Sequence, residues 1–323
     1  MTTPFLSTEA ALAQNTSLIA SFWNSMQKGT IPVKKGLHCF YAYAIPKHAK
    51  HAVFVCQGRI EAAHKYQELL WELYQNGYAV FTLDHLGQGS SSRLSQDPHL
   101  GYIDDFQDYV DCLAQFFAHE SMQPFKDNII MLAHSMGGAI ASLFLAQYPK
   151  HCKAAFLSAP MFAIHTHGKP MWLVKYLAIA MCKLGLAKSY ALGQGPYAPV
   201  AFELNELSHS QIRYENFRAL YRLHPQLQLG GISYGWLSAA LEAMAKIAEL
   251  TLTLPIHIIS AQEDTIVNSK SHPCITARWP NTSVHSVPNA KHELLFEQDV
   301  IRTEVMTRFY SFAATVCSED TGS

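Results

Sequence analysis

The sequence predicts an α/β fold with a mostly parallel, doubly wound sheet, and two observations carry this prediction. Short apolar segments alternate with helical segments along most of the 323 residues. Several of the short segments, such as 129–132, are apolar at every position, as expected for parallel strands covered by helices on both faces. Right-handed crossovers between such strands place helices on both sides of the sheet.

The expected strands are residues 36–45, 52–57, 78–84, 128–134, 154–159, 255–260 and 283–287. The expected helices are residues 62–75, 106–119, 137–147, 236–250 and 299–314. These elements assign residues 36–160 and 236–317 to the α/β core. We expect a helical extension over residues 1–35 and a disordered tail over 318–323.

The alternation of strands and helices is interrupted once, over residues 161–235. This segment is predicted to contain no strand, and it holds an apolar stretch, several aromatic residues, Gly and Pro. An insertion that leaves after one strand and returns before the next is typical of a helical cap. Such a cap would cover the carboxyl edge of the sheet, where open α/β sheets bind their ligands.

The composition excludes some classes of partner. Hydrophobic residues make up 49% of the chain and charged residues 15%, well below the usual value of about 25%. Lys and Arg number 24 against 25 Asp and Glu, and no basic run or zinc-ligand spacing occurs. We therefore expect no nucleic-acid partner.

The cysteines and the N-terminus favour a reducing compartment. The seven cysteines are scattered without a CxxC pair, and several stand in apolar segments, as Cys56 does. They are interpreted as buried reduced thiols. Residues 1–14 lack a basic segment followed by an apolar one, so no secretory signal is predicted. The expected location is cytoplasmic, with peripheral contact to the inner face of the membrane as an additional hypothesis.

That hypothesis concerns residues 171–187, the most hydrophobic stretch of the chain. Lys175 and Lys183 interrupt it, and it is too short for a good transmembrane span. One interpretation is a cap helix that binds an acyl chain and approaches an anionic membrane surface. The alternative is a helix that forms the core of the cap.

The sharpest local motif is the segment 128–138. It places Ser135 between an apolar strand and a helix, in the pattern G-x-S-x-G with Ala133 in the first position. Small residues at 133 and 137 allow the tight turn that exposes the serine hydroxyl, and the helix N-terminus stabilises a developing oxyanion. The alternative is that Ser135 only caps the helix.

A nucleophilic serine needs a base and an orienting carboxylate, in the chain order Ser, acid, His. The strand 255–260 leads into a polar loop with Glu263 and Asp264, of which we favour Asp264. Of the 17 histidines, only His292 stands in a loop after a strand and follows both partners. The predicted catalytic triad is Ser135, Asp264 and His292.

The oxyanion is expected to bind two backbone N–H groups. One is that of Met136, and the other that of Arg59, in the loop after the strand 52–57, where Gly58 permits a bend. No metal and no cofactor are required. The Gly-rich segment 84–89 lacks the third glycine of G-x-G-x-x-G and is interpreted as a connecting turn, with Asp84 as a structural acid.

Taken together, these motifs resemble the lysophospholipase L2 and monoacylglycerol-lipase-like branch of the α/β-hydrolases. The resemblance covers most of residues 36–315. Besides Asp264, it rests on segments 58–61, 84–89, 97–101, 106–109, 132–140, 158–161, 193–196 and 292–297. Gln57 and Ala133 depart from the monoacylglycerol lipases, and the bacterial lysophospholipase L2 branch is the closer match.

The resemblance implies an α/β-hydrolase fold and a serine hydrolase that releases a fatty acid from a lysophospholipid. The expected partner is then a lipid or lysophospholipid substrate. A monoacylglycerol lipase or general carboxylesterase is the alternative within the enzyme class. A lipid-binding protein without turnover is the alternative outside it, although an intact triad argues against that hypothesis.

Overall fold

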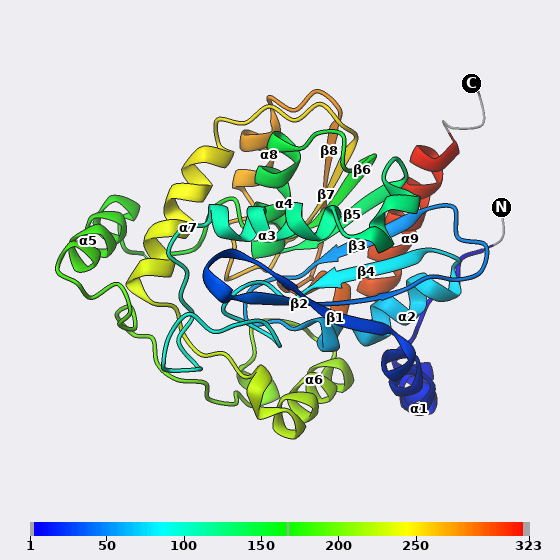
Figure 1. Ribbon diagram of the computed structural model, residues 1–323, viewed down its shortest axis with the longest axis horizontal. Helices are drawn as coiled ribbons and strands as arrows, with labels where there is room; N and C mark the ends of the chain where they lie inside the picture. The colour runs from blue at the N-terminus through cyan, green and yellow to red at the C-terminus, as the bar shows by residue number, and fades with distance from the viewer. Residues whose placement is uncertain (1–2, 167, 319–323) are drawn as a thin grey trace.

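The computed structural model describes residues 3–166 and 168–318 and shows an eight-stranded sheet between two layers of helices (Figure 1). The strand order is β1-β2-β4-β3-β5-β6-β7-β8. The pairs β1–β2 and β2–β4 are antiparallel. The remaining pairs, from β4 and β3 to β7 and β8, are all parallel. The predicted α/β fold with a mostly parallel, doubly wound sheet is confirmed.

The strands are β1 (Gln27–Pro32), β2 (His38–Ala44), β3 (Ala52–Cys56), β4 (Ala79–Leu83), β5 (Ile129–His134), β6 (Ala154–Ser158), β7 (Ile256–Ala261) and β8 (Thr282–Val287). The α-helices are α1 (Glu9–Ser25), α2 (Gln67–Gln75), α3 (Gln107–Phe117), α4 (Met136–Gln147), α5 (Met171–Lys183), α6 (Gln211–Leu223), α7 (Tyr234–Ile247), α8 (Ser271–Thr276) and α9 (Asp299–Ser318). The predicted tail lies outside the described residues except for Ser318, which ends α9.

The N-terminal region is not purely helical, so that expectation is wrong for its second half. Helix α1 is followed by β1, which pairs with β2 and forms one edge of the sheet. The sequence of β1 is Gln-Lys-Gly-Thr-Ile-Pro, and only Ile31 is buried. An edge strand with one buried position lacks the apolar run on which the strand predictions depended.

Two hydrophobic clusters, one on each face of the sheet, pack the strands against the helices. In β3, Phe54 and Cys56 join one cluster with residues of α3, α4 and α7, whereas Val53 and Val55 join the other with residues of α2 and α9. Successive side chains of a strand point to opposite faces, so an apolar strand must be covered on both sides. Figure 1 shows the two helical layers.

The segment between β6 and β7 contains α5, α6 and α7. Helix α5 packs against α7 and lies at one end of the molecule in Figure 1. Helix α6 is tied to the core by Arg213, whose guanidinium contacts Glu68 at 3.0 Å and Asp299 at 3.1 Å. The division into a core and a cap at residues 161–235 stays a prediction. Among the described residues, no helix has both the length and the hydropathy needed to cross a membrane.

The N-terminal segment is held to the core by a buried ion pair between α2 and α9. Arg302 Nη1 donates to Glu72 Oε2 at 2.7 Å and to the Ser7 carbonyl at 3.0 Å. The Glu72 carboxylate also accepts the Ser7 N–H and the Tyr310 hydroxyl. Because the pair is buried, removal of one partner leaves the other charge without compensation.

We expect Arg302→Met to lower the free energy of unfolding by about 3–5 kcal/mol, because it leaves Glu72 buried and unpaired. Equilibrium urea denaturation measures this change. Arg308→Met, on the same helix, is the matched control: its pair with Glu304 is partly exposed, and its loss is expected to cost about 1 kcal/mol or less. Equal losses of unfolding free energy in the two variants would contradict the larger contribution expected of the buried Arg302–Glu72 pair.

Candidate active site

Ser135 occupies a strained turn between β5 and α4. Its backbone has φ 51° and ψ −120°, in the left-handed region that non-glycine residues seldom adopt. Gly137 makes this turn sterically feasible, because a Cβ at that position would lie 2.2 Å from the Cys56 carbonyl oxygen. The predicted elbow thus corresponds to a backbone constraint at Ser135.

The structure brings Ser135, His292 and Asp264 into one hydrogen-bonded chain. His292 Nε2 lies 2.9 Å from Ser135 Oγ, and His292 Nδ1 lies 2.7 Å from Asp264 Oδ2. All three residues are buried. They follow β5, β7 and β8, so the parallel strands deliver them to the same edge of the sheet.

Asp264, and not Glu263, contacts the imidazole. Its second oxygen, Oδ1, accepts the N–H groups of Ile266 at 2.9 Å and Val267 at 2.8 Å, which fixes the carboxylate. Burial alone would raise the pKa of Asp264, but these bonds and the hydrogen bond to His292 hold it below its ordinary value. The side chain of Glu263 is 51% exposed and points to His209.

The loop after β3 is held in a fixed shape beside Ser135. Ile60 has φ 68°, and its carbonyl accepts the Tyr221 hydroxyl at 2.7 Å. Gln88 Nε2 donates to the carbonyls of Gly58 and Glu61, both at 2.8 Å. Neither the Arg59 N–H nor the Met136 N–H donates a hydrogen bond within the described chain. Their role as oxyanion donors stays a prediction.

The segment 84–89 is a connecting turn that supports this loop. Asp84 Oδ1 accepts Gln57 Nε2 and the Ala63 N–H, both at 2.6 Å, and Oδ2 accepts the Ser90 N–H at 2.7 Å. A Cβ on Gly89 would lie 2.1 Å from the Asp84 carboxylate. Asp84 therefore acts as a structural acid.

A buried ionic cluster that no sequence motif indicated lies in the loops of Gly58 and His292. Lys65 Nζ contacts Glu61 Oε1 at 2.7 Å and Glu293 Oε1 at 2.5 Å, and Glu61 Oε2 accepts the Gly58 N–H at 2.5 Å. Burial alone would raise the pKa of Glu61, but the charge of Lys65 lowers it. The cluster links the loop of Gly58 to the loop of His292. The i, i+4 spacing of Glu61 and Lys65 was the only local signal, because Glu293 is 228 residues away from Lys65.

His134 was also overlooked as part of the site. Its ring lies 4.8 Å from that of His292, and its Nδ1 is 3.2 Å from the Ser158 carbonyl oxygen. Burial lowers the pKa of His134 to about 4, so the ring is neutral at neutral pH. It therefore adds no positive charge beside His292.

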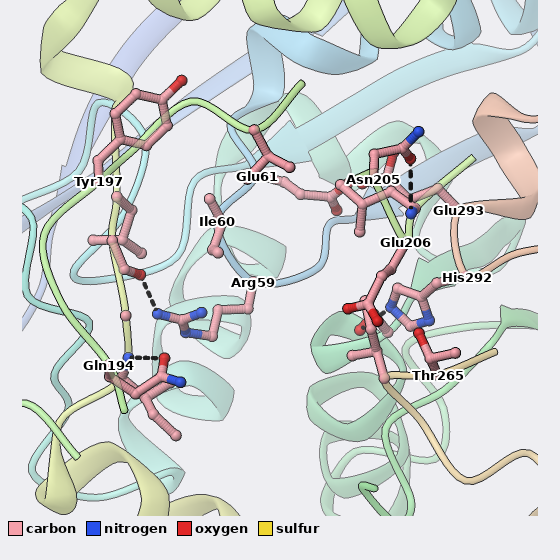
Figure 2. A pocket seen from close by; sticks show the side chains of 18 of the residues that line it. Arg59, Ile60, Glu61, Gln194, Tyr197, Asn205, Glu206, Thr265, His292 and Glu293 are labelled. Atoms are coloured by element: carbon pink, nitrogen blue, oxygen red, sulfur yellow. Dashed lines mark hydrogen bonds between the residues drawn. The ribbon is translucent and has the colours of Figure 1, made fainter. Parts of the chain in front are cut away.

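A cavity of about 620 Å³ opens onto Ser135 and His292. Figure 2 shows Arg59, Gln194 and Tyr197 on one side of it, and His292, Thr265 and Glu206 on the other. Its apolar lining includes Met161, Ile164, Val200, Leu204, Leu207, Phe217, Leu229, Ile232, Trp236, Ile266 and Val267. This volume falls within the usual range for small-molecule pockets, about 300–1,000 Å³.

A serine, a histidine and a carboxylate in this chain order, at the carboxyl edge of a parallel sheet, define a serine hydrolase with the α/β-hydrolase fold. A family model described as "Serine aminopeptidase, S33" matches residues 47–299. The chain belongs to this family.

Similar proteins indicate the branch of the α/β-hydrolases to which the chain is related. Lysophospholipase L2 of Escherichia coli is 32% identical in an alignment that covers 91% of this chain and 89% of that protein. A monoglyceride lipase of Rattus norvegicus is 26% identical and covers 73% of this chain and 72% of its own. A soluble variant of monoglyceride lipase from Saccharomyces cerevisiae, solved with a substrate analog, superposes with a TM-score of 0.71 at 18% identity, over 90% of this chain and 96% of that one. The predicted branch of the α/β-hydrolases is confirmed.

We expect Gly137→Ala to impair both stability and turnover. The added Cβ would collide with the β3 carbonyls, so the free energy of unfolding should fall by about 1–3 kcal/mol. Displacement of Ser135 should lower kcat by about 10²-fold. Thermal unfolding and ester hydrolysis measure the two effects.

The matched control is Gly195→Ala, in the cavity wall, where an added Cβ meets no atom within 4 Å. A Gly137→Ala protein as stable and active as this control would show that the close approach to β3 is not required.

Proposed function

We propose that this enzyme is a lysophospholipase, which releases the remaining fatty acid from a lysophospholipid through an acyl-enzyme. The enzyme is an ester hydrolase. The observation that carries the proposal is the hydrogen-bonded chain from Ser135 through His292 to Asp264, with distances of 2.9 and 2.7 Å. The choice of substrate is supported by the 32% identity to lysophospholipase L2, compared with 26% to a monoglyceride lipase.

In the proposed mechanism, Ser135 Oγ attacks the ester carbonyl while His292 Nε2 accepts its proton. Asp264 orients the imidazole and stabilises its protonated form. His292 then donates the proton to the departing alcohol of the glycerol backbone. A water molecule, deprotonated by His292, then attacks the acyl-enzyme. His292 returns this proton to Ser135 Oγ as the acyl–oxygen bond breaks, and the fatty acid is released.

The tetrahedral intermediate carries its negative charge on the former carbonyl oxygen. We assign its stabilisation to the backbone N–H groups of Met136, at the N-terminus of α4, and of Arg59, in the loop after β3. This assignment is supported by the lack of any other acceptor for the two groups within the described chain. Each such donor typically contributes a factor of about 10²–10³ in rate.

Monoacylglycerol hydrolysis is the second candidate, because monoglyceride lipases are also relatives of this chain. The two substrates share the acyl ester and the glycerol backbone, and they differ in the phosphodiester headgroup. The apolar cavity lining suits the acyl chain of either one. Discrimination therefore depends on groups that contact the headgroup.

We further propose that α5 and the residues around it contact the surface of an anionic membrane. Of the helix, only Ala178 is buried, whereas Trp172 and Tyr176 are 62% and 65% exposed. This exposure disfavours the alternative in which the helix forms the core of the cap. Residues 169–188 also contain four lysines and no acidic residue. An exposed apolar helix flanked by lysines suits an interface with anionic lipid.

Ser135→Ala should abolish hydrolysis of lysophosphatidylcholine, with a loss of about 10⁴-fold or more, because the nucleophile is removed. Fatty-acid release and labelling by a fluorophosphonate probe measure the effect. Ser142→Ala is the matched control in α4, since that serine only bonds the Gly138 carbonyl of its own helix. Retained turnover or labelling in Ser135→Ala would refute the assigned nucleophile.

Replacing both Trp172 and Tyr176 by Ser should weaken binding to phosphatidylglycerol vesicles by about tenfold or more, because each aromatic ring buries apolar area. Vesicle co-sedimentation measures this, with phosphatidylcholine vesicles as the uncharged comparison. Leu18→Ser is the control, because Leu18 is 57% exposed on α1, far from α5 in Figure 1.

Undiminished vesicle binding by the double variant would contradict membrane contact through α5. A dimer that forms without vesicles and dissociates on the same substitutions would assign the surface to a second copy of the chain instead.

A further inference from the structure

Arg59 contributes a side chain as well as a backbone N–H to the cavity. Its Nη2 donates to the Gly230 carbonyl at 2.5 Å, and its guanidinium lies 5.3 Å from the ring of Trp236. Its Nε is buried and finds no acceptor among the described residues. No carboxylate in the described chain forms an ion pair with this guanidinium.

The surrounding backbone holds this guanidinium in place. A Cβ on Gly101 would lie 2.7 Å from Arg59 Nη2, so the side chain packs directly against a glycine. Gly101 in turn exchanges backbone hydrogen bonds with Gly231 and Ser233, at 2.9 and 2.8 Å. A fixed guanidinium loses little further freedom when it binds an anion.

A second guanidinium without an ion pair among the described residues, that of Arg218, lines the same cavity. Arg218 is only 8% exposed, and its Nε and Nη1 donate to the hydroxyls of Tyr214 and Tyr197. Its Nη2 donates no hydrogen bond within the described chain. The third cavity cation, Lys65, differs because it forms ion pairs with both Glu61 and Glu293.

Arg59 is partly buried, and its Nε is fully buried. A guanidinium removed from bulk water without a carboxylate partner is unfavourable, because desolvation of its charge is not compensated. Burial lowers the pKa of Arg59 to about 10, which leaves the group charged at neutral pH. Glu206, an exposed acid of the cavity lining, forms no ion pair with it within the described residues, and Figure 2 shows Glu206 on the opposite side of the cavity from Arg59. An anionic ligand in the cavity would supply the missing negative charge.

We propose that Arg59 and Arg218 form a subsite for the phosphodiester group of the substrate, while the acyl ester lies at Ser135. Guanidinium groups bind phosphate oxygens through charge-assisted, often bidentate hydrogen bonds. Arg59 Nη2 donates to the Gly230 carbonyl, and Figure 2 shows the Arg59 side chain on the side of Gln194, away from His292. The headgroup and the ester would therefore occupy different parts of one cavity.

This inference rests on the proposed function, and it names the residues that distinguish a lysophospholipid from a monoacylglycerol. The test is the ratio of kcat/KM for octanoyl lysophosphatidylcholine to kcat/KM for octanoylglycerol. The short acyl chain keeps both substrates monomeric, so surface charge does not contribute. A disturbance of the Arg59 backbone affects both substrates and cancels in the ratio.

Arg59→Gln and Arg218→Gln should each lower this ratio by about ten- to a hundredfold, the usual effect of losing a hydrogen bond to a charged group. Arg59→Lys, which keeps the charge but loses the bidentate geometry, should fall between Arg59→Gln and wild type. Arg222→Gln is the matched control, because Arg222 is exposed on the same helix as Arg218 and does not line the cavity. Its ratio should equal that of wild type.

If the wild-type enzyme hydrolyses both substrates and the ratio is unchanged in both Gln variants, the phosphodiester subsite is refuted while the lysophospholipase function stands. If the wild-type enzyme hydrolyses only octanoylglycerol, both proposals fail.

A measurement on the wild-type protein covers the case in which the variants do not fold. Glycerophosphocholine should inhibit octanoylglycerol hydrolysis competitively, whereas glycerol at the same concentration should not. Equal inhibition by the two compounds, or inhibition by neither, would overturn the subsite.

Discussion

The conformation of Ser135 is the constraint on which the site depends. A positive φ at a non-glycine residue is unfavourable and persists only where the surroundings enforce it. Here β5 fixes one side of the residue and α4 the other, and Gly137 passes within van der Waals reach of β3. The energy that the sheet gains by burying its central strands therefore holds the serine hydroxyl in position.

The rest of the site is assembled around this serine by loops at the same edge of the sheet. Asp264 is fixed by hydrogen bonds from two backbone N–H groups, in addition to its contact with His292. The loop of Arg59 is fixed by Gln88 and by Glu61, and Lys65 joins that loop to the residue after His292. Ser135, His292 and the loop of Arg59 are thus oriented by contacts that exist without substrate, as electrostatic preorganisation of the proposed mechanism requires.

Much of this arrangement was predictable, and the exceptions have physical causes. The central strands were predictable because burial on both faces demands apolar residues throughout. The contact of Ser135, His292 and Asp264 was predictable because their chain order and loop positions are characteristic. Strand β1 was missed because an edge strand needs only one buried residue, Ile31. Lys65 pairs with Glu293, and Arg59 has no carboxylate partner within the described residues. Both features depend on segments that are distant in sequence, so a local sequence pattern could not predict them.

The anchoring of α6 by Arg213 has a consequence for how the cavity exchanges its contents. Arg213 contacts Glu68 on α2 and Asp299 on α9, so moving α6 outward would separate the three charges and expose the buried Arg213 and Glu68. Tyr214, Phe217 and Arg218 of α6 line the cavity, so this part of the cavity wall should stay in place while product leaves and new substrate enters.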